Sequence, residues 1–285
     1  MARVATRWVY QLGYPVLGRD AVKQFPPVRF MARRIAATLR EPTAVVDGHD
    51  MLLDPVDSLR LSVVGVYEPF ETSLVKKLLR PGDVAVDVGA NIGYYTLLFA
   101  RAVGPEGRVI AFEPEPTNFA ILERNVKVNG YEERVHLVQA ACGPRSGTTK
   151  LFLSDSNMGD HTLLALDDRT DRSVDVEETT LDDVVADVDL IRLLKVDVQG
   201  GEMGVMAGAP RTLGNTEVLV SEYSPWRLTE AGLSPGALLE EIRRAGFRID
   251  RIDEPTRRLT PVGSGLTESA NLICRRPGVD GAPSG

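Results

Sequence analysis

The chain has 285 residues, of which 43% are hydrophobic and 6% aromatic, a composition typical of a folded globular protein that excludes wholesale disorder. This length accommodates one large α/β domain with an additional segment. The formal net charge of −7 argues against nucleic acid as the main partner.

The beginning of the chain is basic and the remainder is acidic. Residues 1–40 contain eight Lys or Arg residues and one acid, Asp20, so they carry +7, and the total of −7 leaves −14 on the rest. We expect residues 1–45 to form a helical arm, broken at Pro15 and at Pro26-Pro27. Such an arm can be a plain solvated helix, or it can make weak peripheral contact with anionic membranes. The charge pattern leaves both interpretations open.

The cysteine content and the apolar runs predict the compartment. Cys142 and Cys274 are the two cysteines, too few for a disulfide framework in a chain of this length. No apolar run approaches the roughly 20 residues that a membrane-spanning helix needs. The N-terminal residues also lack the continuous apolar stretch of a secretory signal. These features predict a cytoplasmic protein.

Secondary-structure signals follow one another regularly after the arm. Residues 44–66 predict short strands with an Asp-Gly turn, and from Val84 apolar strand patterns alternate with helical ones. The predicted strands are 84–88, 108–114, 135–141, 148–154, 190–198, 218–223, 247–252 and 270–276, and the predicted helices are 93–103, 117–128 and 235–245. We expect a polar loop over 154–175 and a disordered tail over 277–285.

The alternation of strands and helices predicts the fold class. It is typical of an α/β protein with a mostly parallel sheet covered on both faces. Only a loop separates the last two predicted strands, so we expect them to form an antiparallel pair. A sheet of this kind binds its ligand at the carboxyl ends of the strands.

The strongest motif is VDVGANIGYYT at 86–96, where a buried strand turns into a helix. Gly89 and Gly93 would let the backbone approach a ligand closely, and the following helix offers free N–H groups. The spacing is neither G-x-G-x-x-G nor a phosphate-binding loop. Sites for NAD, FAD and S-adenosylmethionine share such turns, and a purely structural turn is the alternative.

An acid at the tip of the next strand strengthens this motif. Glu113 lies 26 residues after Asp87, and in this topology its carboxylate sits beside the glycine turn. There it can accept hydrogen bonds from both hydroxyls of an unphosphorylated ribose. The alternative is that Glu113 caps the helix that begins near Pro116.

KVDVQGGE at 195–202 ends the central strand. Lys195 and Asp197 are two residues apart and should point to the same side of the strand, with Asp197 facing the ligand crevice. Asp197 could instead cap a helix beginning at Gly201-Glu202. Lys195, inside an apolar strand, needs a partner, and a nearby acid would supply one.

One of the three histidines lies in the loop SDSNMGDHTLL at 154–164. His161 could cover the pocket and act as a base, although a lone loop histidine is more often polar surface. His49 and His136 form no cluster with metal-ligand spacing, so the sequence indicates no metal site.

Taken together, these motifs resemble the FkbM family of S-adenosylmethionine-dependent methyltransferases. The resemblance runs from about Tyr67 to about Phe247, and its segments are YEP (67–69), PGDVAVDVGANIGYYT (81–96), AFEPEP (111–116), the N-x-G-x-H-T-L loop (157–163), KVDVQGGE (195–202) and SEY (221–223). The family often has an acid where this chain has Gln199.

The resemblance implies a Rossmann-like class I methyltransferase fold, a seven-stranded, mostly parallel sheet with an antiparallel last strand, over residues 46–276. It implies that S-adenosylmethionine is the cofactor and that Glu113 holds its ribose. It further implies that the methionine part lies against the glycine turn and the adenine beside the end of the third strand. The remaining residues implied to bind the cofactor are Glu68, Asp87, Gly89, Asn91, Gly93, Pro114, Ala141, Cys142 and Asp197.

The resemblance also implies an acceptor hydroxyl on a sugar, glycan, polyketide or other secondary metabolite. Methyl transfer mainly requires that two reactants be held at attack distance, and a base helps an alcohol acceptor. Asp197, His161 and Glu222 are the candidate bases. An NAD-dependent oxidoreductase and a non-catalytic binding module are the alternatives, although no Tyr-x-x-x-Lys pair favours the oxidoreductase.

Overall fold

The computed structural model describes residues 42–154, 157–165, 172–263 and 265–279. Nearly all of the predicted arm (1–45) and residues 280–285 of the predicted tail therefore lie outside the described residues. The chain divides into two compact units, Met1–Tyr67 and Glu68–Gly285. Within the described ranges, no helix has both the length and the apolar character required to cross a membrane.

The described part of the first unit contains a β-hairpin. β1 (Thr43–Val46) pairs antiparallel with β2 (His49–Leu52). The predicted Asp-Gly turn joins them, with positive φ at both Asp47 (48°) and Gly48 (77°), as a two-residue hairpin turn of type I′ requires. The strand prediction for the remainder of 44–66 was wrong. Asp54 accepts hydrogen bonds from backbone N–H groups two and four residues later, and the turn leads to the short helix α4 (Leu61–Val64).

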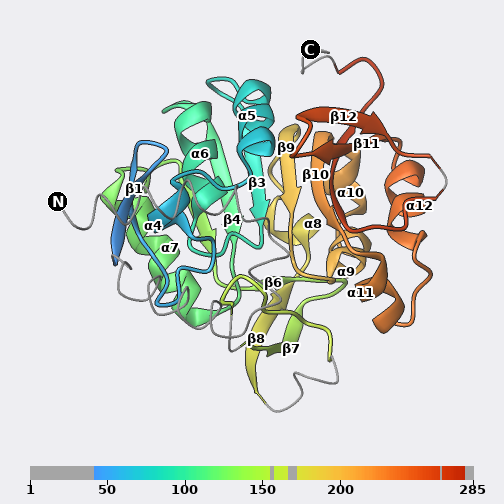
Figure 1. The fold of residues 1–285 in the computed structure, drawn as a ribbon, viewed down its shortest axis with the longest axis horizontal. Coiled ribbons are helices and arrows are strands. Elements are labelled where there is room, and N and C mark those ends of the chain that lie inside the picture. The colour runs from blue at the N-terminus through green and yellow to red at the C-terminus, as the bar shows by residue number, and fades with distance from the viewer. Residues whose placement is uncertain (1–41, 155–156, 166–171, 264, 280–285) are drawn as a thin grey trace, which may run out of the picture. The chain divides into compact units, whose positions relative to one another are not determined.

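The second unit is built on an eight-stranded sheet (Figure 1). Its order is β12-β11-β13-β10-β9-β3-β4-β5. The strands are β3 (Val84–Val88), β4 (Arg108–Phe112), β5 (Val135–Val138), β9 (Ile191–Val196), β10 (Thr216–Tyr223), β11 (Arg248–Asp253), β12 (Arg258–Pro261) and β13 (Ala270–Arg275). β5, β4, β3, β9 and β10 are parallel, and β13 runs antiparallel to both β10 and β11.

The predicted α/β fold, with its mostly parallel sheet and antiparallel last strand, is therefore confirmed. The structure adds β12 to the seven strands expected. The loop after β11 turns back on itself, with Asp253 accepting a hydrogen bond from the N–H of Thr256, and returns as an edge strand. Three of the four residues of β12 are exposed, so its sequence RLTP shows no alternation of buried apolar and exposed polar residues.

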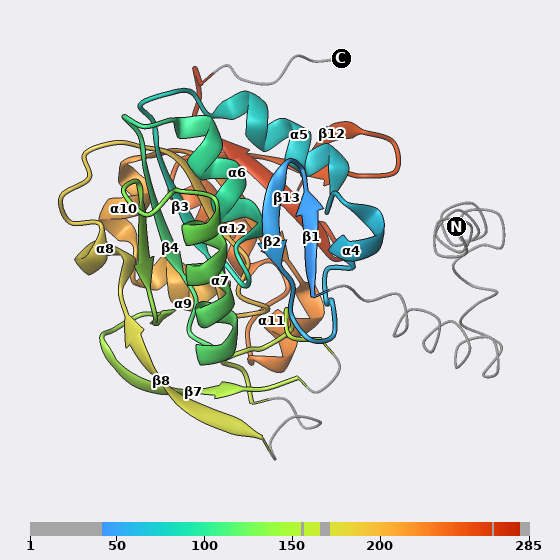
Figure 2. The same ribbon diagram turned by 90° about the vertical axis from the view of Figure 1, so that its left-hand side faces the viewer.

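Helices cover both faces of this sheet (Figure 2). α5 (Pro69–Leu78), α6 (Tyr94–Val103) and α7 (Pro116–Val128) pack together on one face, and α8 (Leu181–Val184), α9 (Glu202–Ala207), α10 (Pro210–Gly214) and α12 (Ala237–Arg244) on the other. α11 (Pro225–Glu230) follows β10. The three predicted helices are confirmed. α8 to α11 have four to six residues each, which is too short for helical periodicity to identify them.

A separate three-stranded sheet lies at the lower edge of Figure 1. Its order is β6-β8-β7, from β6 (Ala141–Cys142), β8 (Ser173–Thr179) and β7 (Gly147–Phe152). The prediction of one strand over 135–141 was wrong at its C-terminal end. The third strand of the large sheet, β5, ends at Val138, and Ala141 and Cys142 pair instead with β8.

The large sheet carries the main hydrophobic core. Val86, Ile110, Leu194 and Leu219, one from each of β3, β4, β9 and β10, have no more than 1% of their surface exposed. Because both faces are covered, these strands read as continuous apolar runs. The carboxyl ends of β3, β4, β9 and β10 lie along one edge of the sheet, where the candidate residues gather.

Candidate active site

The glycine turn after β3 is shaped by contacts with the protein. Gly89 and Gly93 have φ values of 84° and 95°, which favour glycine. A Cβ on Gly89 would lie 1.9 Å from the backbone oxygen of Asp197, and one on Gly93 would lie 2.7 Å from Leu122 Cδ1. We expected the absence of a Cβ at these glycines to leave space for a ligand. That expectation was wrong, because both Cβ positions point at protein atoms.

Glu113 is buried beside this turn. Its Oε2 accepts a 2.8 Å hydrogen bond from the N–H of Asn91, and its Oε1 accepts one of 2.9 Å from the N–H of Glu115. Burial raises the pKa of Glu113 to about 7. The helix-cap alternative for Glu113 is wrong, because Glu115 caps α7 by accepting from the N–H of Asn118 at 2.7 Å.

Five polar residues share one face of the sheet at its carboxyl edge. Paired residues of neighbouring strands share a face, as do residues two apart along one strand. Asp87 pairs with Lys195, which also pairs with Val220, and Glu222 pairs with Asn271. The face therefore carries a polar row made of Asp87, Lys195, Asp197, Glu222 and Asn271.

Lys195 is the buried cation of this row. Its Nζ lies 3.1 Å from Asp197 Oδ2 and 4.6 Å from the centre of the Tyr95 ring. Burial alone would lower the pKa of Lys195, but the charges of four acids outweigh it and raise that pKa: Asp197, Asp87, Glu71 and Glu68. The expectations that Lys195 has an acidic partner and points with Asp197 to one side are confirmed.

Asp197 is held by side chains and caps no helix. Its Oδ1 accepts a 2.8 Å hydrogen bond from Gln199 Nε2. Burial would raise its pKa, but the charge of Lys195 and these hydrogen bonds keep the pKa of Asp197 below its usual value. The cap alternative is wrong, because Glu202 accepts from the N–H groups of Val198 and Gly200 before α9.

Two acids at the start of α5 face the polar row. Glu68 accepts hydrogen bonds from Tyr95 Oη (3.0 Å) and Asn271 Nδ2 (2.8 Å), and Glu71 accepts one from the same amide group at 2.7 Å. Burial and the charge of Glu68 raise the pKa of Glu71 to about 8. The site thus contains more carboxyl groups than cations.

Three shielded oxygens along this edge accept no hydrogen bond from any described residue: Asp87 Oδ1, Asn91 Oδ1 and Glu222 Oε2. Asp87 uses its other oxygen to accept from the Thr96 hydroxyl at 2.6 Å. Buried acceptors without donors are costly in a folded protein. A positively charged ligand bound at this edge could donate hydrogen bonds to these three oxygens or place its charge beside them.

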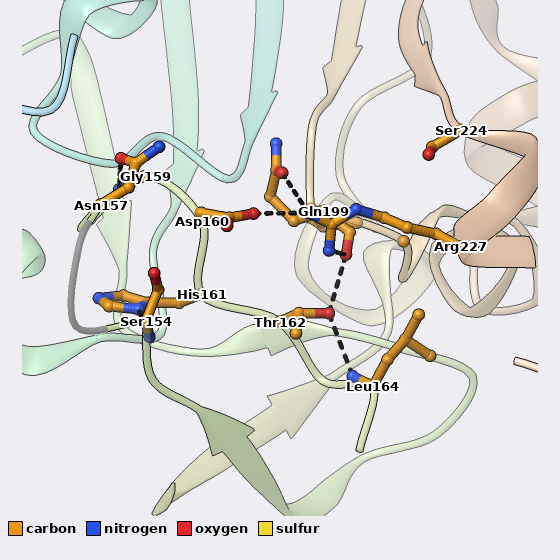
Figure 3. Close-up of polar contacts among 12 residues, drawn as sticks. Ser154, Asn157, Gly159, Asp160, His161, Thr162, Leu164, Gln199, Ser224 and Arg227 are labelled. Atoms are coloured by element: carbon orange, nitrogen blue, oxygen red, sulfur yellow. Dashed lines mark hydrogen bonds and ion pairs between the residues drawn. The ribbon is translucent and has the colours of Figure 1, made fainter. Parts of the chain in front are cut away.

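The loop that carries the N-x-G-x-H-T-L motif is fastened to this edge (Figure 3). Thr162 Oγ1 and Arg227 Nη1 both donate to the backbone oxygen of Gln199, each at 2.8 Å. Arg227 Nη2 also donates to Asp160 Oδ1 and to Gln199 Oε1. Gln199 therefore connects Asp197 with the loop.

His161 points away from this network in Figure 3 and toward Ser154, whose N–H donates to its Nδ1 at 3.0 Å. Its neighbour Asp160, which sequence reasoning missed, is the loop residue that accepts a hydrogen bond from Arg227. Glu71, Tyr95 and Asn271 were missed as well. The sequence gives only a weak signal for these residues, because they join the site through helix packing and through the register of β13.

Of the residues predicted to bind the cofactor, the structure gathers Asp87, Asp197 and Glu68 around Lys195. It brings Asn91 and Glu113 together at the glycine turn, and Pro114 follows Glu113 half-buried. Ala141 and Cys142 are buried in the small sheet, and Cys142 also packs against the main core. They do not end the third strand, as the sequence had suggested.

Residues 87–249 match the methyltransferase FkbM domain. This match covers more than half of the chain and includes the glycine turn, Glu113 and most of the polar row. The chain belongs to the FkbM methyltransferase family. It is therefore a methyltransferase, as the sequence motifs predicted.

Two relatives in sequence support the assignment of this FkbM-family chain. The 2-O-methyltransferase NoeI of Sinorhizobium fredii is 28% identical over 212 residues, which cover 67% of this chain and 85% of that protein. The 31-O-demethyl-FK506 methyltransferase FkbM of Streptomyces tacrolimicus is 33% identical over 160 residues, 46% of this chain and 60% of that one. A solved FkbM methyltransferase from Methylobacillus flagellatus aligns over 90% of this chain and 60% of its own, with 15% identity and a TM-score of 0.45.

Proposed function

We propose that this methyltransferase takes its methyl group from S-adenosylmethionine, bound at the carboxyl edge of β3, β4 and β9. The observation that carries the proposal is the set of shielded acceptor oxygens on Asp87, Asn91 and Glu222, in a site with more carboxyl groups than cations. That environment suits a ligand with a sulfonium and an ammonium group, whereas the two negative phosphates of NAD would be repelled.

Each part of the cofactor has a proposed set of contacts. The turn from Asp87 to Gly93, with Asn91 at its centre, and Glu68 would face the methionine part. Glu113, with its neighbour Pro114, would hold the ribose, since each carboxylate oxygen has one backbone donor and can accept a second hydrogen bond. Ala141 and Cys142, in the segment that follows β5, would lie on the adenine side.

S-adenosylmethionine supplies an already activated methyl group, so the protein mainly positions the reactants and excludes water. Asp197 is ionised and held by Lys195 and Gln199, so we propose that it faces the positive sulfur. Two loop residues would keep the acceptor side closed: Thr162, which bonds Gln199, and Asp160, which bonds Arg227. His161 stays a candidate base on the loop.

The proposed acceptor is a hydroxyl group of a sugar, glycan, polyketide or other secondary metabolite. The names of the two relatives above both specify methylation at oxygen. The test is incubation with S-adenosylmethionine and a panel of hydroxylated sugars and polyketides, followed by mass spectrometry. Formation of an O-methyl product and S-adenosylhomocysteine supports the proposal, whereas methylation only at nitrogen or carbon would overturn the oxygen assignment.

We also propose that the protein works in a reducing compartment such as the cytoplasm, because both cysteines are unpaired and buried. Weak membrane contact through the basic residues 1–40 is a separate proposal, supported only by their charge. Deleting these residues should lower the binding to anionic vesicles and leave cofactor binding unchanged. Equal vesicle binding by both proteins would favour the solvated helix.

A further inference from the structure

The geometry points to Glu222 as the group that accepts the proton of the acceptor hydroxyl, and to the binding of the cationic cofactor as the event that ionises it. This inference rests on the proposed function and goes beyond it by assigning the base. Three observations carry it: the position of Glu222 in the sheet, its unused oxygen and the charges around it.

The sheet register places Glu222 beside Asp197. The last β9–β10 pair is Val196 with Ser221, and both Asp197 and Glu222 follow that pair by one residue on the same face. Ligands of open α/β sheets bind at this edge. Glu222 therefore lies on the strand next to the one that carries Asp197, at the height where cofactor and acceptor should meet.

Glu222 Oε2 is shielded from solvent and has no hydrogen-bond partner among the described residues. The nearby donors are engaged elsewhere. Lys195 bonds Asp197, Asn271 bonds the two acids of α5, and Arg227 bonds Gln199 and Asp160. The oxygen is therefore free to take a proton from a bound hydroxyl.

The charged groups around Glu222 come from β9, α9 and α11. Burial has the largest effect, and with the carboxylates of Asp197 and Glu202 it outweighs Arg227 and Lys195 and raises the pKa of Glu222 to about 9. Without a bound cation, Glu222 is therefore protonated at neutral pH. A sulfonium placed beside it favours the carboxylate form, so cofactor binding and loss of this proton are coupled.

The other two candidates fit the role less well. A base works best when its pKa is near the working pH, whereas the pKa of Asp197 is lowered and both of its oxygens are bound. His161 receives the N–H of Ser154 at Nδ1 and points away from the Gln199 network. Glu222 combines a raised pKa with an unused oxygen.

The acceptor oxygen forms its bond to the methyl carbon, and the electron pair of the broken sulfur–carbon bond stays on sulfur. The hydroxyl proton moves to Glu222 Oε2 and later exchanges with solvent. Glu222 is thus ionised before the step and neutral after it.

The test measures proton release when S-adenosylmethionine alone is titrated into the full-length protein at pH 8. Calorimetry is repeated in buffers of different ionisation enthalpy. We expect the wild-type protein to release most of one proton, the neutral thioether S-adenosylhomocysteine to cause much less release, and Glu222→Gln to lose the release while still binding. Glu71→Gln is the matched control, because Glu71 also has a raised pKa (about 8), and it should keep the release.

Unchanged proton release in Glu222→Gln, or its loss in Glu71→Gln instead, would overturn the inference. Binding of S-adenosylmethionine to the wild-type protein without proton release would overturn it too, and would leave the proposed function intact. An absence of binding would overturn both. If Glu222→Gln does not fold, Glu222→Asp provides the second variant, and it should keep proton release with a shifted pH midpoint.

Discussion

The N–H of Asn91 donates a 2.8 Å hydrogen bond to Glu113 Oε2, and this contact joins the glycine turn after β3 to the tip of β4. The two motifs that the sequence presents separately are therefore parts of one site. A carboxylate fixed by two backbone donors keeps its orientation and has acceptor capacity left for a ribose.

Glu113→Gln should weaken the binding of S-adenosylhomocysteine by about 1.5–3 kcal/mol, the range for a hydrogen bond to a charged group. The amide would also turn an NH₂ group toward one of the backbone N–H donors. Calorimetry on the folded variant measures the change. Glu115→Gln is the control, because Glu115 caps α7, and its loss should lower the melting temperature without changing affinity. Equal affinities in wild-type protein and Glu113→Gln would contradict the ribose assignment.

Gly89→Ala should destabilise the fold far more than Gly82→Ala. Both glycines have similar positive φ values, 84° and 89°, so each alanine carries the left-handed cost of about 1–2 kcal/mol. Only at Gly89 would the new Cβ collide with a backbone oxygen, that of Asp197, since Gly82 has open space around it. Chemical denaturation compares the two variants. Equal losses of stability would show that the close approach of residue 89 to Asp197 does not contribute to the difference.

Asp197→Asn separates two roles for that residue. Because Asp197 is ionised and held by Lys195, we expect the variant to lose about tenfold in affinity for cationic S-adenosylmethionine, equivalent to about 1.4 kcal/mol, and much less for neutral S-adenosylhomocysteine. Titration with both ligands gives the comparison. Normal affinities with a fall of about a hundredfold or more in kcat would instead identify Asp197 as the base.

Asp160→Asn should loosen the loop over residues 157–165, because it removes the carboxylate that receives Arg227. Hydrogen–deuterium exchange of that loop should become faster, and the KM for the acceptor should rise. His161→Ala should instead mainly remove the acceptor of the hydrogen bond from the N–H of Ser154. A large fall in kcat for His161→Ala, with loop exchange unchanged, would restore His161 as the catalytic base.

The sequence predicted the sheet and the residues that follow its strands because long apolar runs and the glycine turn are local signals. It could not predict that the Cβ side of Gly89 faces Asp197, since that contact depends on how β3 and β9 pack. Glu71, Tyr95 and Asn271 were not predicted for a similar reason. They meet Lys195 or its neighbours through α5, α6 and β13, which are far apart in the chain.

Short elements account for the remaining differences. β12 is mostly exposed and β6 has two residues, so neither shows an alternating apolar pattern, and Ala141 and Cys142 were assigned to the wrong strand. Asp160 was not predicted because its contact with Arg227 joins the loop to α11, 67 residues away in the chain. Gln199 was seen only as a departure from the family pattern, whereas it bonds both Asp197 and Arg227.

We propose that this edge of the sheet binds S-adenosylmethionine through Glu113 and the polar row. The most direct measurement is calorimetric titration of the full-length protein with S-adenosylmethionine, S-adenosylhomocysteine and NAD under identical conditions. We expect saturable binding of the first two ligands at one site per chain, weakened in Glu113→Gln, and no binding of NAD. Binding of NAD in place of S-adenosylmethionine would contradict it.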